Sequence, residues 1–175
     1  MPLQPAGPED LTAVAALVNA AYRGESSRRG WTTEADLIGG QRTDASSLAD
    51  DLAATPGAQL LVLSDAADGP PLGCVWLEPA DHPGAWYLGM LTIRPDLQAR
   101  GLGRELLADA EAAAKARGAQ RIRMTVISIR PELIAWYGRR GYAATGETQP
   151  FPYGDLRRGE PKRDDLSFLV LEKRL

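Results

Sequence analysis

Residues 98–103 constrain this chain more than any other segment, because they join two elements of different periodicity. The run before them, residues 87–93 (YLGMLTI), is apolar and rich in β-formers, which predicts a buried strand. The run after them, residues 102–117, repeats its apolar residues at helical spacing. Gly101 and Gly103 allow the backbone to approach a ligand and to present unpaired N–H groups at the positive end of a helix dipole. The junction therefore predicts a strand, a phosphate-binding turn and a helix.

Two common phosphate loops do not fit this turn. The dinucleotide-binding fingerprint requires a third glycine where Leu106 stands, and the chain contains no Gly-Lys-Ser or Gly-Lys-Thr triplet for a nucleoside triphosphate loop. A Gly-x-Gly pair between a strand and a helix also fits a plain structural turn. Both interpretations of the turn stay open on this motif alone.

The whole chain has the size and composition of a single globular domain, covering residues 1–175. Its 175 residues are too few for two ordinary domains, and 25% charged with 44% hydrophobic residues indicates neither disorder nor a membrane protein. The lone cysteine, Cys74, excludes an internal disulfide, and the lone histidine, His82, leaves little with which to build a metal site. We expect Cys74 to be a small core residue.

Charge and hydropathy limit the partners and the location. A formal charge of −3 argues against general nucleic-acid binding, which relies on a basic surface. No apolar run approaches the roughly 20 residues of a membrane-spanning helix, and the first ten residues lack the basic and apolar regions of a signal peptide. We therefore expect a cytoplasmic protein that binds neither nucleic acid nor membrane.

Periodicity and turn residues predict a mixed α/β fold. Helices are expected at residues 10–22, after Thr33 up to Gly39, from the capping residue Asp44 to 54, and at 102–117 and 132–139; strands at 59–64, 72–78, 86–94, 121–127, 142–148 and 166–171; a turn at 68–71; and a long loop at 149–165. The helix at 102–117 supplies the crossover that would let strand 121–127 run parallel to strand 86–94.

Two motifs resemble those of the GNAT family of N-acetyltransferases, and the resemblance extends over nearly the whole chain. The family pattern Gln/Arg-x-x-Gly-x-Gly/Ala is filled by Gln98, Gly101 and Gly103. A second pattern, Asn-x-x-Ala-x-x-x-Tyr-x-x-x-Gly-Phe/Tyr, is matched over residues 130–142 at its tyrosine, its glycine and its final aromatic residue. Arg130 and Leu133 stand where the asparagine and alanine are usual, so the asparagine contact with the cofactor does not transfer.

The resemblance implies a fold and a co-substrate. The fold is a mixed, mostly antiparallel sheet with a splayed parallel strand pair and about four flanking helices. The co-substrate is acetyl-CoA, whose pantetheine arm would add like a short strand beside the splayed strand. The residues that would contact it are Leu91, Thr92, Ile93, Gln98, Ala99, Arg100, Gly101, Leu102, Gly103, Arg104 and Arg130. Gly89 would permit a bulge in that strand, and Arg100 and Arg104 have the alternative of being solvated surface side chains.

Two residues carry the expected chemistry. By resemblance, Tyr137 protonates the departing CoA thiolate, a task that suits a phenol with a pKa near 10. The attacking amine must be neutral, and Glu78, at the end of a strand beside the expected cleft, is the candidate base. The alternatives are that Tyr137 is a core aromatic next to Trp136 and that Glu78 is a solvated carboxylate before Pro79.

Family members select their acceptors through the region after the first helix and through late loops. Here Trp31 and Arg28 fall in the first region and Phe151 in the second. Trp31 and Phe151 would line or cover an acceptor pocket and Arg28 would hold a carboxylate, whereas each aromatic ring could equally pack on its own domain.

These observations predict an enzyme that transfers acetyl from acetyl-CoA to a primary amine by direct attack. Cys74 lies inside a strand with no histidine beside it, which argues against a covalent intermediate. The acceptor class, a small molecule or a peptide, does not follow from the residues, nor does the homodimer that the family permits. Two alternatives stay open: an acyltransferase with another acyl group or an oxygen acceptor, and a CoA-binding sensor without turnover.

Overall fold

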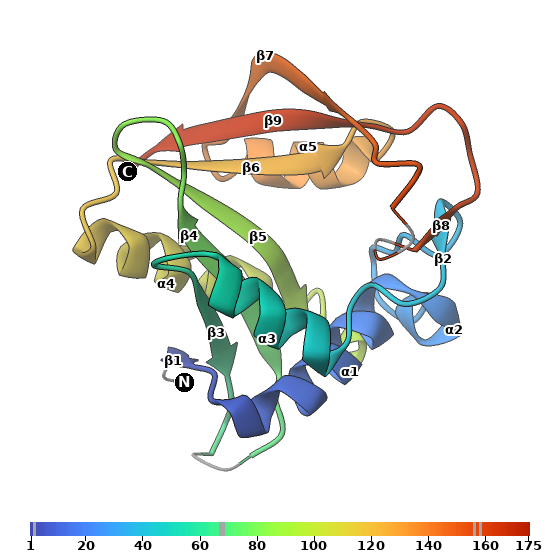
Figure 1. Ribbon diagram of the computed structural model, residues 1–175, viewed down its shortest axis with the longest axis horizontal. Helices are drawn as coiled ribbons and strands as arrows, with labels where there is room; N and C mark the ends of the chain where they lie inside the picture. Colours follow the sequence, from blue (N-terminus) through green and yellow to red (C-terminus); the bar gives the residue numbers. More distant parts are fainter. Residues whose placement is uncertain (2, 67–68, 156, 158) are drawn as a thin grey trace.

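The computed structural model describes residues 1–175 apart from residues 2, 67–68, 156 and 158 (Figure 1). Its helices are α1 (Leu11–Tyr22), α2 (Gly24–Ser27), α3 (Ala45–Ala54), α4 (Leu102–Ala116) and α5 (Pro131–Gly138), with 3₁₀ turns η1 (Pro8–Asp10) and η2 (Pro95–Leu97). Its strands are β1 (Leu3–Pro5), β2 (Ile38–Gly39), β3 (Gln59–Leu63), β4 (Gly73–Pro79), β5 (Ala85–Ile93), β6 (Arg121–Ile127), β7 (Ala143–Pro150), β8 (Glu160–Pro161) and β9 (Ser167–Arg174).

The described strands form one large sheet and one small one. The large sheet has the order β1-β3-β4-β5-β6-β9-β7, in which β5 and β6 are parallel and the other neighbours are antiparallel. Helix α4 provides the crossover between the parallel pair, as the sequence predicted. The mixed, mostly antiparallel sheet with one parallel pair and flanking helices confirms the expected fold class.

The parallel strands separate after a short contact. Pairing joins Ala85–Tyr87 to Arg121–Arg123, and beyond it β5 turns away from β6 (Figure 1). The opposite edge of β5 carries a bulge: Thr92 lies opposite Cys74 and Gly89 opposite Trp76, so Met90 and Leu91 together face one residue of β4. Met90 has a φ of 53°, a left-handed conformation that the bulge imposes on a non-glycine residue. The bulge therefore follows Gly89 directly.

Helices cover both faces of the large sheet. Helices α1 and α3 pack on one face around Val14, Val18, Leu48 and Trp76. Helix α4 packs on the other through Leu106, Leu107, Ala110 and Ala114, with Leu102 and Ala113 partly buried beside them. The spacing predicted all of these positions except Leu107. Figure 1 shows α3 and α1 in front of the strands and α4 behind them. Cys74 is fully buried between α1 and the sheet, as expected of a core residue.

Two expectations were wrong in detail. The segment after Thr33 is a turn and not a helix, because Ile38 and Gly39 pair with β8 and the Thr33 hydroxyl hydrogen-bonds the Ser27 hydroxyl and accepts from Ala35 N–H. The loop expected at 149–165 contains the end of β7 and all of β8. The turn expected at 68–71 begins outside the described residues, although the hairpin on either side of it is present.

Candidate active site

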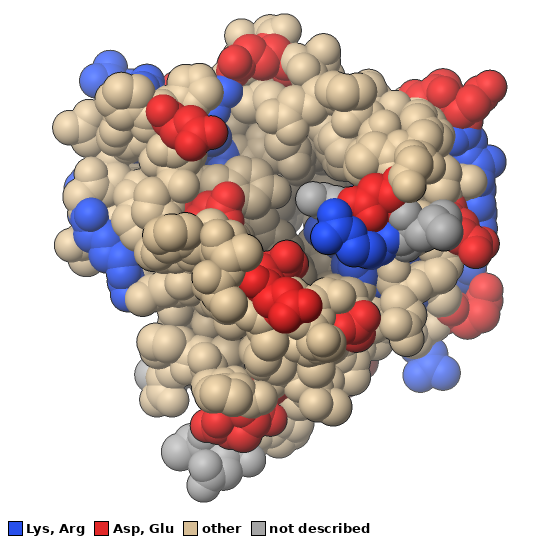
Figure 2. Space-filling view, viewed as in Figure 1, with Lys and Arg blue, Asp and Glu red and all other residues tan. Residues whose placement is uncertain are grey.

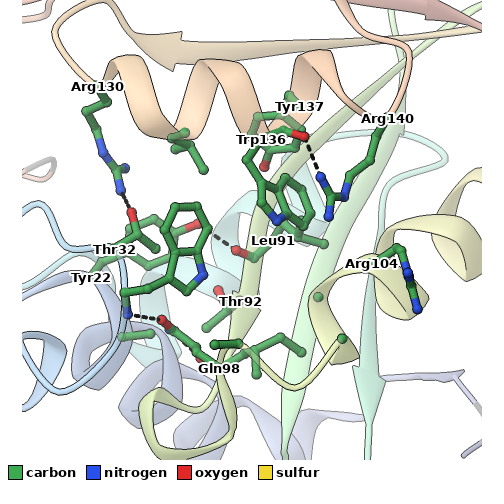
Figure 3. Close-up of a pocket in the computed structure, with 17 residues that line it drawn as sticks. Tyr22, Thr32, Leu91, Thr92, Gln98, Arg104, Arg130, Trp136, Tyr137 and Arg140 are labelled. Atoms are coloured by element: carbon green, nitrogen blue, oxygen red, sulfur yellow. Dashed lines mark hydrogen bonds between the residues drawn. The ribbon is translucent and has the colours of Figure 1, made fainter.

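Two cavities meet where β5 leaves β6. The first, about 300 Å³, lies between the end of β5, the start of α4 and helix α5 (Figure 3). The second, about 890 Å³, opens on the face covered by α1 and α3. The residues that line both are Tyr22, Leu91, Arg130, Leu133 and Tyr137. A molecule in one cavity can therefore touch a molecule in the other at these side chains.

The turn before α4 has the conformation that an anion site needs. Ala99 and Gly101 have φ angles of 62° and 87°, both in the left-handed region. Gly101 is the N-cap of α4 and supplies no side-chain cap, so the first N–H groups of the helix have no side chain to receive them. Ala99, Gly101 and Gly103 all line the first cavity. The open N–H groups and the helix dipole together favour a phosphate at this point.

Gln98 fixes this turn to its surroundings. Its Nε2 donates to the carbonyl of Ile93 at 3.0 Å, and its Oε1 accepts from the backbone N–H of Trp31 at 3.1 Å. The amide thus joins the end of β5 to the segment after α2, which closes one side of the first cavity (Figure 3). The motif glutamine was expected to contact the cofactor; its hydrogen bonds give it a role in shaping the cavity that the sequence did not indicate.

Two arginines add positive charge to the first cavity, one from the first turn of α4 and one from just after the end of α5. Arg104 and Arg140 line it, and Arg140 lies over the Trp136 ring at 3.6 Å while donating to the Trp136 carbonyl at 2.6 Å. Burial lowers the pKa of Arg140, and the neighbouring charges of Arg139 and Arg104 lower it further. This grouping of like charges has the chemistry to bind a phosphate chain, and with the turn it fits coenzyme A. Arg100 and Leu102 line neither cavity.

The end of β5 offers backbone groups to the first cavity. Leu91, Thr92 and Ile93 line it at the point where β5 has no pairing with β6. Tyr22 is half-buried, and its hydroxyl donates to the carbonyl of Leu91 at 2.8 Å, which holds one residue of the bulge in place. An extended amide-bearing chain could continue the sheet along this edge.

Tyr137 lies at the meeting point of the cavities. Its ring is buried, with its centroid 5.0 Å from that of Trp136 and 5.7 Å from that of Tyr142, both in edge-on arrangements. Burial raises the pKa of Tyr137 well above its ordinary value, so the phenol stays protonated across the neutral range. Tyr137 is thus both a packed core aromatic and a residue that lines the two cavities.

The remaining predicted residues fall in different places. Glu78 lines the second cavity, and its Oε2 accepts from Trp76 Nε1 at 2.6 Å. Phe151 is buried and lines the same cavity. Trp31 lines the first cavity instead, 41% exposed, with its ring 6.4 Å from Trp136. Arg28 lines neither cavity, because Glu25 and Asp36 hold its guanidinium on the surface.

A buried ionic network borders both cavities. Arg130 donates to Glu34 at 3.2 Å and to the Thr32 hydroxyl, and Glu34 also pairs with Arg23 at 3.4 Å. The network joins α5 to the segment after α2. The sequence predicted that Arg130 contacts acetyl-CoA. It did not indicate Tyr22 and Glu34, since nothing in their local pattern distinguishes them from ordinary helix and turn residues.

This geometry agrees with comparison to known proteins. The sequence pattern of the Acetyltransferase (GNAT) family matches residues 17–142, which include the β5 bulge, the glycine turn and α5. The chain belongs to this family of acetyltransferases. The GNAT chain is 38% identical over 104 residues to a mycothiol acetyltransferase from Tsukamurella paurometabola, a match that covers 58% of this chain and 34% of that protein. It thus spans about a third of the length of that relative.

Solved structures share the GNAT fold over all or most of the chain. A ribosomal-protein-alanine N-acetyltransferase from Brucella melitensis superposes with a TM-score of 0.70 at 20% identity, covering 100% of both chains. A GNAT acetyltransferase from Elizabethkingia anophelis, solved with acetyl-CoA bound, has a TM-score of 0.60 at 18% identity over 73% of this chain and 82% of its own. Within the described residues, no helix combines the length and hydropathy required to cross a bilayer.

Proposed function

We propose that this protein transfers the acetyl group of acetyl-CoA to the primary amine of an acceptor. The observation that carries the proposal is the meeting of two cavities at the splayed strand. One presents a phosphate-type turn and arginines, and the other opens separately to solvent. Two substrates can therefore enter from opposite faces and react at Leu91 and Tyr137.

The proposed binding of acetyl-CoA follows the first cavity from end to end. The glycine turn from Gln98 to Arg104, with Arg140, takes the phosphates. The pantetheine arm lies along Leu91, Thr92 and Ile93, with Trp31 and Trp136 beside it. The thioester then reaches the junction with the second cavity, next to Tyr137.

The proposed reaction is one direct transfer. The neutral amine attacks the thioester carbonyl carbon, a C–N bond forms, and charge develops on the carbonyl oxygen next to the backbone N–H groups of the bulge. The C–S bond then breaks, and the Tyr137 hydroxyl gives its proton to the thiolate. The amine loses its proton to Glu78, directly or through water. Phe151 lines the path of the acceptor.

A two-step route through a cysteine is disfavoured. Cys74 is fully buried, and burial raises the pKa of its thiol to about 12. A thiol of that pKa holds almost no thiolate at neutral pH, and the thiolate is the nucleophile.

Calorimetry and thiol release test the proposal together. We expect acetyl-CoA and CoA to bind in preference to NADP, which serves as a phosphate-bearing control, and free thiol to appear only when an accepted amine is present. The same measurements with longer acyl-CoA thioesters show which acyl group the protein prefers. Binding without thiol release for any amine or alcohol would favour a CoA sensor over an enzyme, and absence of CoA binding would overturn the proposed function altogether.

A further inference from the structure

The second cavity contains an arginine that the proposed reaction does not use. Arg42, in the segment between β2 and α3, lines this cavity and is half-buried. Its buried Nε has no hydrogen-bond partner, and within the described part of the chain its guanidinium forms no ion pair. A buried N–H donor without an acceptor costs free energy, and a guanidinium that lines a cavity has further N–H donors to offer a ligand.

Arg42 lies close to the proposed point of reaction. Its guanidinium carbon is 5.4 Å from the centre of the Tyr22 ring, and the Tyr22 hydroxyl holds the Leu91 carbonyl at the bulge. One aromatic side chain therefore spans the distance between Arg42 and the strand that would carry the thioester. A group bound by Arg42 would lie within a side chain's length of the attacking amine.

Other arginines line the second cavity together with Arg42. Arg23 and Arg130 line the same cavity, and both pair with the carboxylate of Glu34. Burial lowers the pKa of Arg23, and the Arg42 charge lowers it further while Glu34 raises it. Within the described residues Glu34 is thus engaged by other arginines, which leaves Arg42 suited to bind an anion.

Besides Glu34 and the proposed base Glu78, five further carboxylates of the described residues line the second cavity. Asp50, Asp51 and Asp81 are exposed on its rim, where Figure 2 shows acidic side chains around a hollow in this face. Two others are paired: Glu147 with Arg123, and Asp155 with Arg157. The rim would attract a cationic amine from solvent, whereas within the described residues none of these carboxylates forms an ion pair with Arg42.

We propose that the acceptor carries an anionic group close to its amine, as an amino acid does, and that Arg42 binds that group. The proposal rests on the proposed function for the identity of the reaction and adds the class of the acceptor. A carboxylate or an equivalent oxyanion would accept two parallel hydrogen bonds from the guanidinium, which orients the neighbouring amine toward the bulge of β5.

Matched acceptors test this inference directly. The common L-amino acids are compared with their carboxamides and their decarboxylated amines, by thiol release and by calorimetry in the presence of saturating CoA. We expect kcat/KM for at least one amino acid to exceed that for both its carboxamide and its decarboxylated amine by about 30-fold or more, the range of a charged hydrogen bond. Because the dead-end complex with CoA reports acceptor binding alone, it can support or overturn the acceptor class even if no turnover occurs.

Variants of Arg42 then assign the contact. R42Q should raise KM for the preferred amino acid by about 30-fold and change kcat little. It should leave kcat/KM for the decarboxylated amine unaltered. R42K should restore only part of the loss, because lysine lacks the planar guanidinium that donates two parallel hydrogen bonds. R117Q, on the exposed end of α4, is the matched control and should behave as wild type. Equal loss for both acceptors in R42Q would indicate a structural role and overturn the assignment. The acceptor class is overturned if no amino acid binds, or if a diamine without an anionic group is preferred.

Discussion

At the residue scale, Tyr137 combines a packing role with a chemical one. Its hydroxyl is the group that a phenylalanine would remove, while the ring contacts with Trp136 and Tyr142 would remain. We expect Tyr137→Phe to lower kcat by about 100-fold, within the range of general acid catalysis, and to leave the Kd for CoA within about twofold. Stopped assays of thiol release and calorimetry measure the two quantities, and unchanged kcat would remove Tyr137 from the proposed mechanism.

The raised pKa of Tyr137 gives the same proposal a pH dependence. A phenol acts as an acid only while protonated, and burial moves its ionisation above the ordinary value near 10. The active form therefore persists to higher pH than for an exposed tyrosine, so kcat should show no fall from phenol ionisation up to about pH 10. A decline with a midpoint near pH 8 in the wild type that is absent in Tyr137→Phe would contradict this assignment.

At the scale of elements, the turn before α4 contains two glycines whose substitutions should have different effects on stability. Gly101 has a φ of 87°, which costs a residue with a Cβ about 1 kcal/mol or more, so Gly101→Ala should lower both the free energy of unfolding and CoA affinity. Gly103→Ala is the comparison, because its added Cβ would lie 3.7 Å from Trp136, an ordinary contact. We expect it to weaken CoA binding without loss of stability in urea. Equal stability of the two variants would argue against the strained turn.

The elements that sequence could predict are those with long periodic patterns. Helices α1, α3 and α4 and strand β6 begin and end within a residue or two of expectation, since apolar spacing and the Asp44 cap specify them. Elements of two to four residues, α2, β2 and β8 among them, were missed because they depend on contacts between distant segments. Lys162, for example, donates to the carbonyl of Ala35 beside the β2–β8 pair.

The residues of the candidate site also fall into those that a local pattern identifies and those that only the fold brings together. The glycine turn and Tyr137 were identified from motifs that occupy one stretch of chain. Tyr22, Glu34 and Arg42 come from the first third of the sequence and reach the cavities only through folding, so no local pattern marks them. Trp31 was assigned to the acceptor, whereas its hydrogen bond to Gln98 places it beside the first cavity.

The Glu34 network connects elements and should be costly to break. The side chains of Arg23 and Arg130 are each 4% exposed, and both pair with the same carboxylate. Glu34→Gln keeps the shape but removes the carboxylate that pairs with both buried arginines, so we expect a loss of about 3–5 kcal/mol in the free energy of unfolding. Urea denaturation measures it. Asp36→Asn, which breaks an exposed pair with Arg28, is the control and should cause no measurable change.

At the scale of the whole molecule, the large sheet consists of two sections joined by few backbone pairs. One section is β1-β3-β4-β5 and the other β6-β9-β7, and the parallel pairing between them is limited to Ala85–Tyr87 with Arg121–Arg123. The first cavity is lined from both sections, by the end of β5 on one side and by α5 on the other. A ligand that fills it would hold the two sections together.

This arrangement predicts how acetyl-CoA should affect the whole fold. At about 100 times its Kd a ligand adds roughly 2.7 kcal/mol, which for a chain of this length raises Tm by about 5–11 °C. If the ligand bridges the two sections of the sheet, hydrogen exchange should slow together in residues 91–93, in the first turn of α4 and in α5. The exchange rates of β7, at the far edge of the sheet, should stay unchanged. Protection restricted to the turn of α4 would mean that only the phosphates are held, and that the thioester does not reach Tyr137.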